Sequence, residues 1–185
     1  MPIPEFDHNY VLPPHLGNPS FPGHASPYDC NTLELCKRFA TNSVRITILS
    51  NYILFRQKLD KYGIINGFQW LDGSFCEDIE SVESRHPNDL DIVTFYGGIN
   101  NDIIPTIMSD FTEFIDPEKS KKNYLIDHYV VDYYYSPDVT IKKTSYWFQL
   151  FSHNRRQVWK GILRIELNTP EIDLLALNYL QSLRS

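Results

Sequence analysis

The sequence predicts a mixed α/β domain of the α+β kind, in which helices flank a small mixed sheet and an extended, proline-rich arm comes first. The 185 residues are 42% hydrophobic, which is enough for one compact core. Segments of helical period alternate with short β-branched and aromatic segments, an order typical of mixed α/β folds. Seven of the twelve prolines lie in residues 1–28, where no helical period is visible. We therefore expect an arm at residues 1–28 and a single domain at residues 29–185.

The arm carries many large apolar side chains, which a purely disordered linker would not usually contain. We expect it to lie on the surface of the domain, and the alternative is a tail that binds a partner. The side chains concerned are Phe6, Tyr10, Val11, Leu12, Leu16, Phe21 and Tyr28.

Residues 31–62 have helical spacing, which we expect to be interrupted at residues 41–43. The hydroxyl and amide side chains there can cap a new helix N-terminus. The second helix then places large apolar side chains at spacings of three and four, which is typical of a stripe facing the core. These side chains are Val44, Ile48, Tyr52, Phe55 and Leu59.

Four segments rich in β-branched and aromatic residues are expected to form the sheet. Residues 67–71 form a short strand, and a turn follows at residues 72–75. Residues 89–96 form a central strand that ends at Gly97-Gly98. The other two strands are expected at residues 124–135 and 160–167.

Three more helices are expected in the second half of the chain. Residues 101–115 can be helical only if Pro105 lies in the first turn. Residues 143–153 carry apolar side chains at helical spacing. The last helix has the clearest start, because Thr169 is a good N-cap residue and Pro170 suits the first helical position.

Composition and charge exclude several classes of protein. The formal charge of −6 argues against broad non-specific attraction to nucleic acid, so a nucleic-acid partner would need a local basic patch. No apolar run approaches the roughly 18 residues that a membrane span requires. Without a secretory signal pattern, we expect a cytoplasmic protein with no membrane contact. Three cysteines without CxxC spacing argue against a disulfide framework and a zinc site.

The most informative segment is Asp89-Leu90-Asp91 at the start of the predicted central strand. Carboxylates two positions apart on a strand point to the same face, roughly 6 to 7 Å apart. Burying two like charges together is costly unless a cation or hydrogen-bond donors offset them, so this spacing suits a divalent cation. The alternative is that one or both side chains are solvated or cap the start of the strand.

A Gly73-Ser74 pair precedes this segment and follows the predicted strand at residues 67–71. Glycine lets the backbone approach a ligand closely, and a serine hydroxyl with neighbouring amides can hold phosphate oxygens. The alternative is an ordinary turn. A strand, a Gly-Ser turn and a second strand that opens with Asp-x-Asp are more informative together than any one of them.

In these residues the sequence resembles the nucleotidyltransferase superfamily of DNA polymerase β type, and the remainder, including residues 146–148 and 159–162, resembles the minimal bacterial nucleotidyltransferase-like proteins. That superfamily is marked by a Gly-Ser pair, a strand carrying Asp-x-Asp and a third carboxylate on a later strand. The matching residues are Gly73, Ser74, Asp89 and Asp91, and the resemblance covers roughly residues 43–135.

Two residues compete for the third carboxylate of this pattern. Asp132 is flanked by apolar residues on both sides, whereas Asp127 lies nearer the polar start of the predicted strand. Because their numbers differ by an odd number, they point to opposite faces of a regular strand. We therefore expect Asp132 to complete the site, with Asp127 as the competitor.

The resemblance implies an Mg²⁺-dependent nucleotidyltransferase that moves a nucleotide from an NTP to a protein, RNA or small-molecule acceptor and releases pyrophosphate. Two Mg²⁺ ions would be held by Asp89, Asp91 and Asp132, while Gly73 and Ser74 would bind the nucleotide's phosphates. Small members of the superfamily often act in toxin–antitoxin or antiviral (phage-defence) systems, so the resemblance implies such a role. The alternative is a catalytically inactive relative that regulates by binding a nucleotide or a partner protein.

Two charged regions stand apart from this pattern. An acidic stretch follows the Gly-Ser pair, and Arg85 and His86 could offset its charge. Basic positions interleaved with aromatic residues follow the third strand, and could bind a base or an RNA end, or could form the solvated edge of a core helix. The acidic residues are Glu77, Asp78, Glu80 and Glu83; the basic positions are Lys142, Lys143, Arg155, Arg156 and Lys160.

Overall fold

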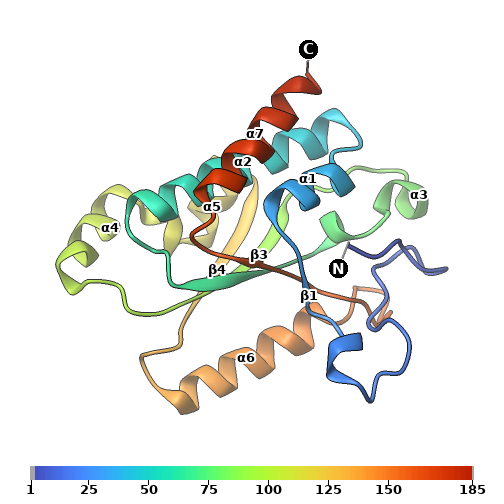
Figure 1. The fold of residues 1–185 in the computed structure, drawn as a ribbon, viewed down its shortest axis with the longest axis horizontal. Coiled ribbons are helices and arrows are strands. Elements are labelled where there is room, and N and C mark those ends of the chain that lie inside the picture. The colour runs from blue at the N-terminus through green and yellow to red at the C-terminus, as the bar shows by residue number, and fades with distance from the viewer. Residues whose placement is uncertain (1–2, 185) are drawn as a thin grey trace.

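The computed structural model describes residues 3–184 as a five-stranded mixed sheet with helices on both faces (Figure 1). The strand order is β1-β5-β2-β3-β4. The β1–β5 and β3–β4 pairs are parallel, and β2 is antiparallel to both of its neighbours. The predicted mixed α/β class is confirmed. The strands are β1 (Tyr28–Asp29), β2 (Gly67–Asp72), β3 (Leu90–Tyr96), β4 (Ile126–Asp132) and β5 (Leu163–Glu166).

The helices pack on both faces of the sheet, with a large hydrophobic core on one face and a smaller core on the other. In Figure 1, α2 and α7 lie above the sheet and α6 lies below it. Helices α1, α2 and α7 pack against one another over the face that carries Leu71 and Ile92. Helix α6 covers the other face, where its Trp147 and Phe151 belong to the same buried cluster as Trp70. Their bounds are α1 (Thr32–Phe39), α2 (Ser43–Lys61), α6 (Pro137–Phe151) and α7 (Pro170–Ser182).

The predicted interruption of the first helical segment is confirmed, and its cause is capping. Asn31 caps α1 in a capping box with Glu34. Asn42 caps α2, where its side chain accepts a hydrogen bond from the N–H of Arg45. The expected stripe faces the core, because Ile48, Tyr52, Phe55 and Leu59 are fully or almost fully buried, while Val44 packs on the core from a half-buried position.

Four expected elements have the wrong bounds, one of them the last strand, where β5 begins at Leu163 rather than at residue 160. Residues 101–115 form a short helix, α4 (Ile104–Asp110), between two 3₁₀ turns. The strand predicted at residues 124–135 is shorter than expected and consists of β4 alone, because α5 (Pro117–Tyr124) precedes it. Helix α6 starts at Pro137 rather than at residue 143, since proline suits a first helical turn. A one-turn helix, α3 (Ile79–Glu83), follows the Gly-Ser turn.

The proline-rich arm lies against the domain, as the sequence indicates. Val11 and Leu12 are completely buried, and Val11 forms an isolated bridge with Glu77. The end of the arm joins the sheet where Tyr28 pairs with Leu163. The buried side chains of the arm and the bridge from Val11 to Glu77 therefore hold the arm against the region that contains the Gly-Ser turn.

Two further findings bear on the classes that the sequence excludes. Within residues 3–184, no helix combines the length and the apolar character needed to cross a membrane. The three cysteines are free, and Cys36 and Cys76 are buried. Burial raises the pKa of the Cys36 thiol to about 12, so this side chain is an inert part of the core.

Candidate functional site

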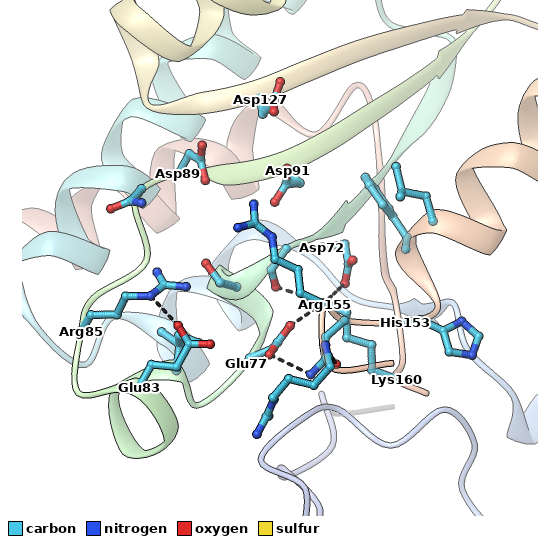
Figure 2. A pocket seen from close by; sticks show the side chains of 18 of the residues that line it. Asp72, Glu77, Glu83, Arg85, Asp89, Asp91, Asp127, His153, Arg155 and Lys160 are labelled. Atoms are coloured by element: carbon cyan, nitrogen blue, oxygen red, sulfur yellow. Dashed lines mark hydrogen bonds and ion pairs between the residues drawn. The ribbon is translucent and has the colours of Figure 1, made fainter. Parts of the chain in front are cut away.

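Three aspartates lie side by side on the adjacent strands β2, β3 and β4, at one end of these strands. Asp91 of β3 pairs in register with Asp72 of β2 on one side and with Asp127 of β4 on the other. Residues directly opposite one another on adjacent strands point to the same face, with Cβ atoms about 5 Å apart. Asp89, two positions before Asp91, faces the same way. Four carboxylates therefore gather on the face that α6 covers (Figure 2).

These carboxylates line a cleft of about 320 Å³. One side of the cleft is the end of the sheet, and another is the turn at Gly73 and Ser74. The segment after α6 forms a further side and contributes His153 and Arg155. Figure 2 shows these groups surrounding one open region.

The turn after β2 requires a glycine. Gly73 has a φ of +82°, a conformation that side chains other than glycine rarely adopt. A Cβ atom at this position would overlap the Asp91 carboxylate oxygen and lie 2.7 Å from its Cγ. The turn therefore brings its backbone directly against Asp91, and Ser74 follows at the wall of the same cleft. The Gly-Ser pair and the Asp-x-Asp segment thus meet in space.

The expectation that Asp132 completes the carboxylate group is wrong. Asp132 pairs with Tyr96 at the opposite end of β3, roughly 16 Å along the strand from Asp127. Its carboxylate accepts a hydrogen bond from the N–H of Tyr134 instead. Parallel strands bring their starting residues together, so the carboxylate beside Asp91 comes from the start of β4. The choice of Asp132 rested on its apolar flanking residues. Such residues indicate that a strand is buried, but they do not indicate at which end of the sheet its carboxylate lies.

Negative charge accumulates around Asp91. Burial, together with the charges of Asp89 and Asp127, raises the pKa of Asp91 to about 6. Lys121 of α5 contacts two of these carboxylates, because its Nζ lies 2.6 Å from an Asp89 oxygen and 3.8 Å from an Asp127 oxygen. This ammonium lies where a cation shared by the two carboxylates would lie. Lys121 is about half exposed, so it can leave this position at little cost.

A buried lysine holds the Gly73 turn in place. Lys160 is 1% exposed, and its Nζ lies 2.9 Å from both an Asp72 oxygen and a Glu77 oxygen. It also donates to the backbone carbonyl of Gly73 at 3.2 Å. Burial raises the pKa of Asp72 to about 7, although Lys160 stabilises its charged form. Lys160 is therefore part of the turn and does not belong to an exposed basic patch.

The acidic stretch after the turn is anchored rather than free. Arg45 of α2 is almost fully buried and donates to the carbonyls of Phe75 and Glu77 at 2.6 and 2.8 Å. It also pairs with Glu80 at 2.7 Å, and His86 lies 3.3 Å from the same carboxylate. Burial alone would raise the pKa of Glu80, but hydrogen bonds from Arg45 hold it at about 2. Much of the acidity beside the cleft is thus already neutralised.

The side chains at Asp89, Asp91 and Asp127 fit a hard divalent cation in their chemistry. Carboxylate oxygens are the ligands that Mg²⁺ prefers, usually one or two of them with water and substrate phosphates. Among residues 3–184, no group of three or more His, Cys, Asp or Glu side chains is arranged so that it could hold a metal ion. The ammonium of Lys121 contacts two of the three carboxylates, those of Asp89 and Asp127.

The chain belongs to DUF6932, a family of unknown function, whose model matches residues 4–166. No curated protein matches the chain. The family match includes the arm, the Gly-Ser turn and all four carboxylates. It therefore covers the candidate site without naming an activity for it.

Proposed function

We propose that the protein is an Mg²⁺-dependent nucleotidyltransferase of the cytoplasm, which moves a nucleotide from an NTP to a protein, RNA or small-molecule acceptor. The observation that carries the proposal is the contact between the Gly73 turn and Asp91, with Asp89 and Asp127 on the same face. A phosphate-binding turn and a group of carboxylates are the two parts that this chemistry needs in one place. The resemblance in sequence supports the same reaction.

Each residue then has a defined task. Asp89, Asp91 and Asp127 would hold Mg²⁺, which would supply charge stabilisation for an in-line displacement. Ser74 and the backbone of the turn would hold phosphate oxygens. Lys160 would keep that turn in place from below. The acceptor hydroxyl would enter from the open side of the cleft.

The position of Lys121 leads to a prediction about metal affinity. Replacing Lys121 by Met is expected to tighten Mn²⁺ or Mg²⁺ binding roughly tenfold, because the ammonium no longer competes for Asp89 and Asp127. Isothermal titration with each metal measures this directly. Lys122→Met is the matched control, since Lys122 is exposed on the same helix and forms no ion pair within residues 3–184. Equal affinities in the two variants and the wild type would contradict competition by Lys121.

The test of the function itself is nucleotide transfer. The protein is incubated with each of the four labelled NTPs and Mg²⁺, with the protein itself, RNA and small hydroxyl compounds as acceptors. We expect pyrophosphate release and labelled product with at least one NTP, and loss of both in Asp89→Asn/Asp91→Asn. If the wild type neither binds any NTP nor releases pyrophosphate, the proposal is rejected.

A second candidate is a catalytically inactive relative that binds a nucleotide or a partner as a regulator. The observation that favours it is the Lys121 ammonium between two carboxylates, which an idle site could keep permanently. NTP binding without pyrophosphate release in every acceptor condition would support this candidate. A role in a toxin–antitoxin or antiviral system stays a prediction from the resemblance.

A further inference from the structure

The cleft has an acidic side and a basic side. The acidic side is formed by the aspartates at the end of the sheet. The basic side is the segment between α6 and β5, which contributes His153, Arg155 and Arg156. In Figure 2 the side chain of Arg155 extends from this segment across the cleft toward Asp91.

Among the residues that the structure describes, Arg155 differs from the other cations of the cleft because its side chain has no partner. Lys160 is paired with Asp72, Lys121 with Asp89, and Arg85 with Glu83. Arg156 donates to the backbone carbonyl of Asn9 at 3.5 Å, whereas Arg155 forms no ion pair and no side-chain hydrogen bond within residues 3–184. A guanidinium without counter-charge is thus directed into a cleft whose opposite side carries carboxylates.

The segment that carries Arg155 is held in a closed loop. The Asn154 side chain accepts hydrogen bonds from the N–H groups of Arg156 and Val158, both at 3.0 Å. Its amide donates to Glu77 at 3.3 Å, which ties the loop to the base of the Gly73 turn. At the ends of the loop, the N–H of Lys160 donates to the carbonyl of Ser152 at 2.8 Å. Arg155 therefore extends from a fixed backbone, which lowers the cost of binding.

We propose that Arg155 binds the polyphosphate of a nucleoside triphosphate and orients it toward the carboxylates that hold the metal. This inference rests on the proposed function and names the residue that recognises the substrate's phosphates. A cleft lined by four aspartates repels a free polyphosphate, so binding requires both a metal on the acidic side and a cation opposite it. A guanidinium presents paired N–H donors that match two phosphate oxygens, and the other arginines of the cleft already have partners.

The test compares binding of inorganic tripolyphosphate and of each NTP, both with Mg²⁺, to wild type and three variants by isothermal titration. In Arg155→Gln we expect both ligands to bind roughly tenfold to hundredfold more weakly, the usual cost of losing a charge-assisted hydrogen bond. Arg155→Lys is expected to recover part of that loss. Lys122→Gln is the charge-matched control, with affinity within about twofold of wild type, because Lys122 is exposed on α5 and does not line the cleft. Mn²⁺ affinity is measured alongside and should be the same in all four proteins.

The outcomes separate this inference from the function on which it rests. Unchanged affinity in Arg155→Gln, with wild type binding NTP, would overturn the role of Arg155 and leave nucleotidyl transfer standing. If tripolyphosphate binds through Arg155 but no NTP binds at all, the phosphate site is supported and nucleotidyl transfer is rejected. If the wild type binds neither Mn²⁺ nor any phosphate ligand, both proposals fail.

Discussion

Asp127→Asn is expected to reduce Mg²⁺-dependent nucleotide transfer roughly a thousandfold, whereas Asp132→Asn is expected to leave it within about twofold of wild type. The reason is register. Asp127 lies opposite Asp91 on the adjacent strand, while Asp132 lies opposite Tyr96 at the other end of β3. Initial rates of pyrophosphate release at saturating NTP measure the effect, and Mn²⁺ titration shows whether Asp127→Asn has lost metal affinity.

The same substitution also has an expected effect on electrostatics that does not depend on activity. The Asp127 charge is one of the causes of the raised pKa of Asp91, after burial and Asp89. In Asp127→Asn the pKa of Asp91 is therefore expected to fall below about 6, and the folded protein should be as stable as wild type or slightly more stable. Loss of transfer together with retained stability identifies a functional group. Loss of activity in Asp132→Asn but not in Asp127→Asn would contradict the assignment.

Local patterns in the sequence predicted most of the fold. Capping residues placed the interruption between α1 and α2, and β-branched and aromatic composition placed β2 and β3 within a residue or two. Helix α5 was missed because its sequence, Pro117–Tyr124, has no apolar stripe. A start signal was nevertheless present, since Asp116 caps the helix and Pro117 occupies its first position.

The candidate site could be predicted only in part, because much of it is formed by residues distant in sequence. The Gly-Ser and Asp-x-Asp patterns are local, so they identified Gly73, Ser74, Asp89 and Asp91. Asp72, Lys121 and Lys160 were not assigned to the site, since their roles depend on strand pairing and on ion pairs across the fold. No spacing rule links Lys160 to Asp72, 88 residues earlier. Strand register could have favoured Asp127, because a helical crossover from β3 to β4 makes the two strands parallel.

Lys160→Met is expected to destabilise the protein by about 3 to 5 kcal/mol near pH 8. The methionine fills similar space, but Asp72 and Glu77 then stay buried without the ammonium that lies 2.9 Å from each of them. Denaturant unfolding followed by circular dichroism measures the change. Lys142→Met is the control, because Lys142 is exposed and pairs with Asp138 on the helix surface, where such pairs contribute roughly 0.3 to 0.5 kcal/mol. Similar losses in both variants would contradict the structural role of Lys160.

The pH dependence of this variant tests the cause of the loss. Burial already raises the pKa of Asp72 to about 7, and Lys160 is the main charge that opposes this rise. Without Lys160 the folded-state pKa rises further, while the unfolded value stays near 3.8. The folded state then binds the proton more tightly, so stability falls as pH increases from about 4 through the folded pKa. Lys160→Met should therefore be less destabilised at pH 5 than at pH 8, and adding Asp72→Asn should remove much of that difference. Because Lys160 also holds the Gly73 carbonyl, a loss independent of pH would instead indicate that the turn itself has moved away from Asp91.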